Sequence, residues 1–264
     1  MIEFDNVYFS YGNGWAVEDF NLKIKKGEFV ALLGSNGSGK STVARLTNGL
    51  FLPDKGNIFI DGKETSKARD ELKAKVGLVF QNPDDQFVGT TVEEDIAFGL
   101  ENLAIEREEA KRRIMEIAEL LDIKKYLRSS PSMLSGGEKQ KVAIAGVLVM
   151  QPEYLILDEI TALLDPVSRK EIFNFVFSIA KEKNMGVLYI THMSNEALNA
   201  DRVVLIHQGK KISEGTPQNV FSNFSLVRSC GVSIPDSLYI AEKLSEFGVI
   251  PKREYTEKEI LEIL

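Results

Sequence analysis

Short apolar runs bounded by turn residues dominate the first eighty positions of the chain. Two of them, Ile2 to Tyr8 and Phe20 to Ile24, alternate apolar with polar side chains, as half-buried strands do. Phe29 to Leu33 is apolar throughout, which is typical of a parallel strand buried on both faces. The remaining elements predicted here are a turn over Phe9 to Gly14, a helix over Thr42 to Asn48, and strands over Asn57 to Ile60 and Val76 to Phe80. This part is therefore predicted to be β-rich, with one helix.

The pattern changes to helical spacing after Pro83 and returns to strands after Met150. Helices are predicted over Val92 to Leu103, Glu106 to Leu121 and Glu138 to Met150, which together form a helical insertion between two core strands. The core then resumes with a strand over Tyr154 to Leu157, a helix over Val167 to Lys183, a strand over Gly186 to Ile190, and a strand over Val203 to Ile206 that turns at Gln208 and Gly209.

Short helices are predicted from Thr216 onward. The chain ends with a capping box, Thr256 to Glu259, before the apolar residues Ile260, Leu261, Ile263 and Leu264. An apolar terminal face of this kind usually packs against another protein surface. We slightly favour the chain's own core over the surface of a partner.

Composition narrows the function classes. With 264 residues the chain can bury a sizeable core, and one large domain with subdomains is favoured. The net charge of −7 argues against broad binding to nucleic acid. A single cysteine, Cys230, excludes an internal disulfide and fits a reducing compartment. No signal peptide is expected, because charged residues begin at Glu3, and Ala143 to Met150 is too short to span a membrane.

The strongest chemical signal is the stretch from Gly34 to Thr42, which follows an apolar strand and opens a helix. Two glycines five apart, followed by Lys40 and Ser41, form the pattern of a phosphate-binding loop. Glycines let successive backbone N–H groups point at phosphate oxygens. Lys40 supplies a positive charge to the β- and γ-phosphates, and the Ser41 hydroxyl is a ligand for Mg²⁺. The sequence thus predicts a site for a nucleoside triphosphate.

Two further stretches extend this prediction. Asp158 and Glu159 follow an apolar strand, so Asp158 can reach the Mg²⁺ while Glu159 orients or deprotonates an attacking water. Ser135, Gly136 and Gly137 stand at a predicted helix start, where a hydroxyl and bare N–H groups bind an anion. Helix capping by Ser135 and Glu138 alone leaves the two glycines unexplained, because glycine weakens a helix. A second phosphate-binding helix end in one chain suggests a site shared across a dimer.

With these motifs, residues 1–220 resemble the ATP-binding subunit of an ABC transporter. The resemblance implies an α/β fold: a P-loop NTPase (RecA-like) core with an antiparallel β subdomain, a helical subdomain at about 82–150, and a C-terminal helical extension over 221–264. It also implies roles. Glu159, Gln81 and the switch residue His192 are catalytic. Ser41, Gln81 and Asp158 serve the metal. The nucleotide contacts are Tyr11, which stacks on adenine, and Gly34, Asn36, Gly37, Ser38, Gly39, Lys40, Ser41, Thr42, Ser135, Gly136, Gly137 and Asp165.

One of these roles, that of His192, has an ordinary alternative. A lone histidine after an apolar strand is more often a packing or capping residue than a phosphate contact, and only the surrounding motifs favour the functional interpretation of His192. By the resemblance, Ser135 to Gln140 act on the ATP of the opposite subunit, and Ala162 to Asp165 form the D-loop.

A narrower resemblance rests on Phe80 to Phe87, on Thr91 to Asn102 and on the tail from Pro217. These stretches are similar to the energy-coupling factor (ECF) subfamily, the importers of vitamins and transition-metal ions. The resemblance implies a second ATPase subunit, either a paralogue or another copy, a transmembrane coupling protein, and a substrate-binding membrane protein. The chain would then lie at the cytoplasmic face of the cell membrane as a peripheral protein, with ATP and Mg²⁺ as its cofactors and no nucleic acid partner.

Three alternatives stay open. The chain could serve a conventional ABC importer that uses a separate binding protein. A soluble ABC ATPase acting on DNA or the ribosome fits less well, because the chain has no long coiled-coil insertion, second nucleotide cassette or basic composition. An inactive regulatory scaffold is disfavoured, because every catalytic position is intact.

Overall fold

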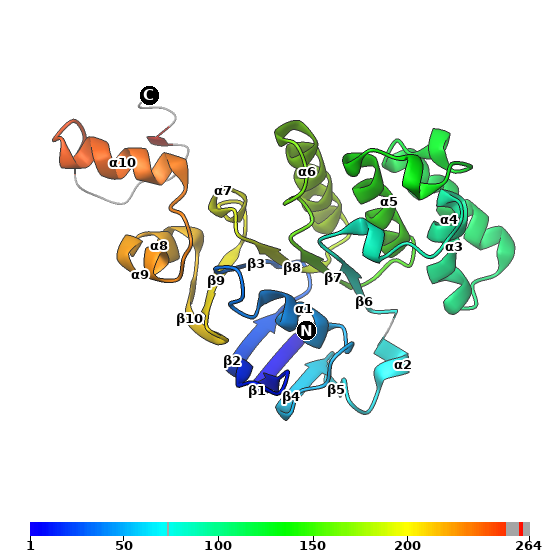
Figure 1. The fold of residues 1–264 in the computed structure, drawn as a ribbon, viewed down its shortest axis with the longest axis horizontal. Coiled ribbons are helices and arrows are strands. Elements are labelled where there is room, and N and C mark those ends of the chain that lie inside the picture. Colours follow the sequence, from blue (N-terminus) through cyan, green and yellow to red (C-terminus); the bar gives the residue numbers. More distant parts are fainter. Residues whose placement is uncertain (73, 252–258, 261–264) are drawn as a thin grey trace.

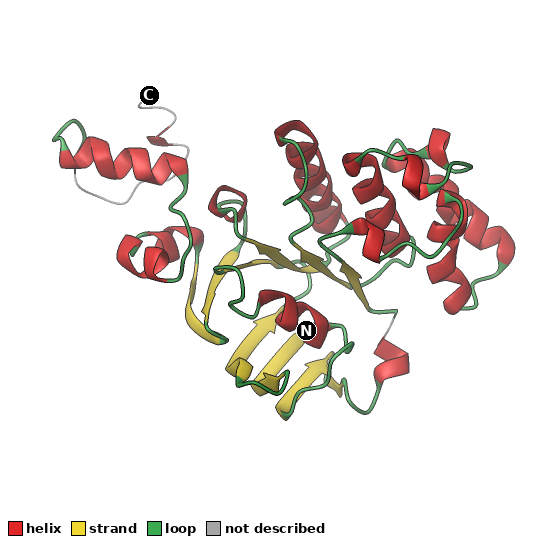
Figure 2. Ribbon diagram, viewed as in Figure 1, coloured by secondary structure: helices red, strands yellow, loops and turns green. Residues whose placement is uncertain are grey.

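Two β-sheets, with helices around them, make up the structure (Figures 1 and 2). The computed structural model describes residues 1–72, 74–251 and 259–260. Its larger sheet has six strands in the order β10-β9-β3-β8-β7-β6. They are β3 (Phe29–Leu33), β6 (Val76–Val79), β7 (Tyr154–Asp158), β8 (Gly186–Thr191), β9 (Arg202–His207) and β10 (Lys210–Gly215). All neighbours pair in parallel except β9 and β10, which form a hairpin. The carboxyl ends of β3, β7 and β8 therefore meet at one edge, where open parallel sheets bind ligands.

The smaller sheet is antiparallel, in the order β2-β1-β4-β5. Its strands are β1 (Ile2–Ser10), β2 (Trp15–Ile24), β4 (Lys55–Ile60) and β5 (Lys63–Glu64). The prediction of a turn from Phe9 was wrong at its start, because Phe9 and Ser10 still belong to β1. The predicted start of the next strand at Phe20 was also wrong, since β2 begins at Trp15. Asp19 has a positive φ of 48°, and the register of β1 with β2 shifts nearby, so the apolar alternation is broken there.

Three sets of helices surround the sheets. The helical insertion holds α3 (Val92–Asn102), α4 (Arg107–Leu120) and α5 (Gly136–Leu148), at one end of the molecule in Figure 1. The core carries α1 (Lys40–Thr47), α6 (Pro166–Glu182) and α7 (Ser194–Ala197), and α8 (Pro217–Phe221), α9 (Phe224–Ser229) and α10 (Asp236–Glu246) lie at the other end. Three 3₁₀ turns cover Pro83–Asp85, Lys124–Tyr126 and Pro131–Met133. The expectation of one helix before Pro83 was wrong, because α2 (Arg69–Leu72) precedes β6. Four-residue helices such as α2 and α7 are too short to show a helical period.

Alternate side chains of β3 enter two separate apolar cores. Phe29, Ala31 and Leu33 pack with the helical insertion and α6, whereas Val30 and Leu32 pack with α1 and the antiparallel sheet. All five are at most 1% exposed. The strand that precedes the predicted phosphate loop is thus held from both faces, so the end from which the loop departs is fixed.

The C-terminal extension contacts the core at the phosphate loop. The Cys230 carbonyl accepts a hydrogen bond of 3.2 Å from the Ser35 N–H. Further along, Ile260 is buried with Ala241 and Ile250 in a small cluster of its own. Most of the predicted capping box at Thr256 to Glu259 lies outside the described residues. The division of the chain into an ATP-binding domain over residues 1–220 and a helical extension over 221–264 stays a prediction.

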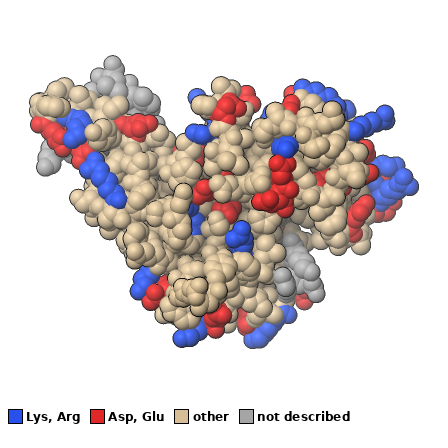
Figure 3. Space-filling model, viewed as in Figure 1, with Lys and Arg blue, Asp and Glu red and all other residues tan. Residues whose placement is uncertain are grey.

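Within the described residues, no helix has the length and apolar character needed to cross a bilayer. On the face drawn in Figure 3, basic and acidic side chains are interspersed among uncharged ones.

Asp61, in the turn between β4 and β5, joins the two sheets. Its carboxylate accepts hydrogen bonds from the Tyr154 hydroxyl at 2.7 Å and from Lys75 at 2.8 Å. Burial alone would raise the pKa of Asp61, but the hydrogen bonds from Lys75, the amino terminus and Tyr154 outweigh it and hold the pKa well below its usual range. The ionised form therefore stabilises the fold above the pKa of an unfolded Asp, and this contribution is lost as the pH falls through the folded pKa.

We predict that Asp61→Asn lowers the free energy of unfolding by about 2 kcal/mol at pH 7, because charge-assisted hydrogen bonds are lost. The difference from wild type should narrow as the pH falls below about 4, where the unfolded carboxyl becomes protonated. Urea unfolding of both proteins at pH 7 and below about pH 4 measures the difference in unfolding free energy. Asp5→Asn, at an exposed position of the same sheet, is the control and should cost less than about 0.5 kcal/mol. A pH-independent difference would contradict the prediction.

Candidate nucleotide site

The phosphate loop runs from the end of β3 to the start of α1. Gly37 and Gly39 have positive φ values of 77° and 105°, and Gly39 is the N-cap of α1. A Cβ atom on Gly39 would lie 2.5 Å from the Ala16 carbonyl oxygen, closer than real Cβ contacts allow. No side chain caps α1, so its first N–H groups stay available to an anion. Ser38 is 2% exposed, and its hydroxyl has no partner among the described residues.

Lys40 is buried at the centre of this site, with 4% of its side chain exposed. Its ammonium donates to the carbonyls of Gly34 and Ser35, both at 3.0 Å, and lies 3.2 Å from a carboxylate oxygen of Glu159. A buried cation needs such partners, because desolvation is costly. The loop carbonyls and Glu159 thus hold the lysine in place.

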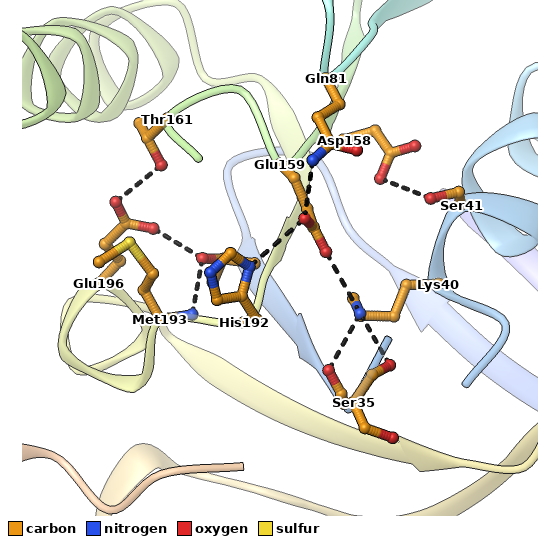
Figure 4. Close-up of polar contacts among 12 residues, drawn as sticks. Ser35, Lys40, Ser41, Gln81, Asp158, Glu159, Thr161, His192, Met193 and Glu196 are labelled. Carbon is orange, nitrogen blue, oxygen red and sulfur yellow. Dashed lines mark hydrogen bonds and ion pairs between the residues drawn. The ribbon is translucent and has the colours of Figure 1, made fainter. Parts of the chain in front are cut away.

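Glu159 is the point at which the predicted catalytic residues meet (Figure 4). Its carboxylate is 9% exposed and contacts three groups: Lys40, the Gln81 amide at 3.2 Å and Nδ1 of His192 at 3.3 Å. The residue has a positive φ of 51°, and its N–H donates to the Ile190 carbonyl at 2.9 Å, which ties it to β8. Residues predicted from three separate stretches are therefore brought together around one carboxylate.

The predicted metal ligands Ser41 and Asp158 also lie side by side. The Ser41 hydroxyl donates to the Asp158 carboxylate at 3.1 Å. Burial raises the pKa of Asp158, the Ser41 hydrogen bond lowers it, and the charge of Glu159 raises it again, with a net rise. Neighbouring ligands about 2.1 Å from an octahedral Mg²⁺ lie about 2.9–3.0 Å apart, so these two oxygens fit adjacent positions on that ion. A divalent cation would also stabilise the ionised form of a buried carboxylate.

Tyr11, the predicted adenine contact, is 60% exposed beside α1. Its hydroxyl lies 3.2 Å from the hydroxyl of Thr42. Its ring meets Phe9 and Phe51 edge to face, with centroids 5.0 and 5.8 Å away, and those two rings stack on each other. The sequence analysis missed Phe51. An aromatic residue between two leucines gives no signal that separates a support for Tyr11 from an ordinary core residue.

Ser135 and Asp165 both stand at helix N-termini away from this cluster. Asp165 caps α6 by accepting from the N–H groups of Val167 and Ser168. At the start of α5, the Glu138 carboxylate accepts from the N–H and hydroxyl of Ser135, at 2.8 and 2.7 Å. The hydrogen bond from Tyr126, followed by those from Ser135, lowers the pKa of Glu138 to about 2.

Gly136 and Gly137, the two glycines predicted to bind an anion beside Ser135, lie close to the segment around Asp165. A Cβ on Gly136 would reach Leu164, and one on Gly137 would lie 3.1 Å from the Ser168 hydroxyl. Within the described chain, no hydrogen bond or ion pair links Ser135, Gly136 or Gly137 to the Lys40–Glu159 pair. One subunit thus does not bring its two candidate phosphate sites together.

A glycine loop with a buried lysine, followed by a serine that meets a strand-end aspartate, defines a nucleoside triphosphatase of the P-loop class. The family model described as ABC transporter matches residues 17–162. The chain therefore belongs to the ABC transporter family, and it is one of the family's ATPase subunits. The predicted fold class and family are confirmed.

Two similar curated proteins carry the same name. The chain is 43% identical to the energy-coupling factor transporter ATP-binding protein EcfA1 of Clostridium novyi, covering 94% of this chain and 91% of that protein. It is 40% identical to the EcfA1 protein of Caldanaerobacter subterraneus, covering 100% and 98%. Among solved structures, cbiO1 from Clostridium perfringens, described as part of the ABC transporter complex cbiONQ, matches with a TM-score of 0.76 at 35% identity, covering 86% of this chain and 93% of that one.

A second solved structure, the ATP-binding cassette MJ0796, is described as a dimer in a post-hydrolysis state bound to ADP and phosphate. It matches with a TM-score of 0.73 at 27% identity, covering 82% of this chain and 99% of that one.

We predict that Gly39→Ala destabilises the protein by about 3 kcal/mol, because it combines an unfavourable φ with a clash against the Ala16 carbonyl. Gly62→Ala is the matched control: its φ of 79° is also positive, but no atom lies within 4 Å of the added Cβ. The control should cost about 1 kcal/mol, from backbone strain alone. Denaturant unfolding of both variants measures the difference. Equal losses would mean that contact with Ala16 does not constrain the loop.

Proposed function

We propose that the chain is the ATP-hydrolysing energy-coupling subunit of an ECF-type importer for vitamins or transition-metal ions. The observation that carries the proposal is the convergence of Lys40, Gln81 and His192 on the buried carboxylate of Glu159. The names of the curated relatives support the subfamily.

In this proposal the phosphate loop binds the triphosphate through its N–H groups and the Lys40 ammonium. Mg²⁺, when held by Ser41 and Asp158 with Gln81 beside them, would supply charge neutralisation on the phosphate oxygens. Glu159 accepts a proton from the attacking water, and His192 holds the γ-phosphate in position for attack by that water. Tyr11 stacks on the adenine.

The contact between Lys40 and Glu159 gives binding a direct link to catalysis. A γ-phosphate and the Glu159 carboxylate compete for the same ammonium, because both are anions seeking one buried cation. Binding of ATP therefore frees Glu159 from Lys40 and lets its carboxylate turn toward the water. Until ATP binds, the Glu159 carboxylate stays paired with the Lys40 ammonium.

The second half of each site comes from a partner ATPase subunit in this proposal. Ser135, Gly136 and Gly137 would bind the partner's ATP, with Asp165 beside them. Exposed apolar side chains surround these residues: Met133 is 81% exposed, Leu163 66% and Val167 69%. Apolar side chains gathered around polar groups are typical of interfaces. The dimeric cassette of similar fold supports a pair of ATPase subunits.

We further propose that a transmembrane coupling protein and a substrate-binding membrane protein complete the assembly, with the ATPases peripheral at the cytoplasmic face. The similar cbiO1 protein is described as part of an ABC transporter complex. The segment after Gln81 and helix α3 expose two large apolar side chains, Val88 at 61% and Phe98 at 47%. Closure of the ATPase pair would move this surface and so drive the membrane partner.

We predict that Glu159→Gln lowers ATP turnover at least about 100-fold, because the amide cannot accept the proton from water. The variant should bind MgATP at least as tightly as wild type, since a neutral side chain no longer competes for Lys40. Light scattering should show a shift from monomer to dimer on adding MgATP, if the chain pairs with itself.

The double variant Glu159→Gln, Ser135→Arg is the control for this dimer. It keeps the phosphate loop intact, so it should still bind MgATP while staying monomeric. Wild-type turnover in Glu159→Gln would contradict the assigned role of Glu159. A variant that binds ATP without dimerising would point to a paralogous ATPase as the obligate partner.

We predict that Phe98→Asp reduces recovery of a transmembrane protein with the tagged chain from detergent-solubilised membranes, because a charge replaces an apolar contact. Turnover of the isolated chain should stay unchanged. Leu120→Asp, a 54% exposed apolar position on α4, is the matched control and should leave recovery unaffected. Equal recovery with both variants would place the membrane contact elsewhere.

A further inference from the structure

Glu196, on the short helix α7, is a buried carboxylate outside the set of predicted site residues. Its side chain receives three hydroxyl hydrogen bonds: from Thr161 at 2.8 Å, from Thr191 at 2.7 Å and from Tyr189 at 2.9 Å. The residue is 9% exposed and makes no ion pair within the described part of the chain. Burial and the charge of Glu196 raise the pKa of Tyr189, so that its hydroxyl stays a donor.

One of these hydrogen bonds fixes the backbone around His192. The Thr191 hydroxyl donates to Glu196, and its oxygen accepts from the Met193 N–H at 3.0 Å. The residues on both sides of His192 are therefore linked through one hydroxyl, which fixes the backbone from which the imidazole projects (Figure 4).

Another hydrogen bond fixes the segment that follows Glu159. Thr161 lies two residues after Glu159 and is 1% exposed. The Arg169 side chain donates to the carbonyls of Thr161 and Leu164, at 3.4 and 3.0 Å, so the position of Thr161 is passed on to the turn that ends at Asp165. That turn is the one proposed to face the partner subunit.

The arrangement is costly if its only role is to fill space. A buried carboxylate must be desolvated, and apolar side chains of similar volume stabilise a core at least as well. Three fixed acceptor contacts instead define one geometry for the groups that donate to them. The donors here belong to the two segments that carry Glu159 and His192.

We propose that Glu196 is a positioning residue for ATP hydrolysis. It holds the segment of His192 and the segment 161–165 in one arrangement, so that Glu159 and His192 face the γ-phosphate together while the turn reaches the partner's site. This proposal rests on the function proposed above. Among the described residues, the Glu196 side chain makes no hydrogen bond or ion pair with those proposed to bind nucleotide or metal.

The test compares valine with serine at each threonine. Thr191→Val and Thr161→Val keep the shape of the side chain but remove the hydroxyl that reaches Glu196. Each should lower kcat about tenfold, because small displacements of catalytic groups are costly, and leave KM within about twofold. Thr191→Ser and Thr161→Ser restore the hydroxyl and should restore kcat to within about twofold of wild type. The affinity of the full chain for MgATP should be the same in all four variants.

Tyr189→Phe is the matched control. It removes a hydroxyl that donates to the same buried carboxylate and lies 3.2 Å from the Thr161 hydroxyl. Both threonine hydroxyls still reach Glu196 in this variant, so kcat should fall less than in the valine variants. In a Glu196→Gln background, Thr191→Val should lower kcat little further, because both changes break one link.

Three results would overturn the proposal. The valine variants could turn over at the wild-type rate when assayed well below their unfolding midpoints, which would leave the cluster a purely structural role. They could raise KM at constant kcat, which would make the defect one of binding. Tyr189→Phe could be as slow as the threonine variants. If the wild-type chain hydrolysed MgATP no faster than the Glu159→Gln variant, the function on which the proposal rests would be contradicted instead. The Glu159→Gln rate therefore serves as the baseline that separates failure of the proposed function from failure of the role of Glu196.

Discussion

The contact between Lys40 and Glu159 is the constraint on which the rest of the site depends. Both charges are buried, with 4% and 9% of their side chains exposed, so each requires the other or a replacement. Removing one partner of a buried pair typically costs about 3–5 kcal/mol, because the remaining charge has no compensation. The pair can form only because β3 and β7 end at the same edge of the parallel sheet, and because the glycine loop folds closely enough for its carbonyls to receive the ammonium. The order of the strands, the glycines of the loop and the packing of both faces of β3 together bring Lys40 and Glu159 into contact.

An ion pair of this kind explains how one subunit can be both stable without nucleotide and ready for it. The triphosphate offers Lys40 a stronger anion than a single carboxylate, so exchange of partners satisfies the lysine while it releases Glu159. Gln81 and His192 already contact the same carboxylate, at 3.2 and 3.3 Å. In the proposed function, these two residues therefore sense whether Glu159 points toward Lys40 or away from it. In the proposed function, a change in the phosphate site reaches the helical subdomain through Gln81 and the switch segment through His192.

Sequence patterns predicted those parts of the molecule in which neighbouring positions carry a repeated signal. Phe29 to Leu33, the phosphate loop and the apolar strand before Asp158 fall where they were predicted, because continuous apolar runs and fixed glycine spacing are local properties. The start of β2 was missed because Asp19 breaks the alternation, and α7 was missed because four residues show no period. Glu196 and Phe51 were missed for another reason. Their significance lies in contacts with Thr161 and Tyr11, 35 and 40 residues away, and a lone acidic or aromatic residue is ambiguous until such partners are known.

Ser135 and Lys40 stand at two different helix starts, and no hydrogen bond or ion pair among the described residues links them. Asp165 caps α6 with its own carboxylate, and at the start of α5 the Glu138 carboxylate accepts from the N–H and the hydroxyl of Ser135. Glycines at 136 and 137 nevertheless keep the approach to the α5 N-terminus free of Cβ atoms, a feature that internal capping does not need. A ligand anion fits there, yet the phosphate loop of the same chain makes no contact with it. In the proposed function, two copies or two paralogues related by a twofold axis resolve this, because each subunit then supplies its Ser135 to the phosphate loop of the other. Such pairing would complete both ATP sites at once and so link hydrolysis at either site to closure of the pair.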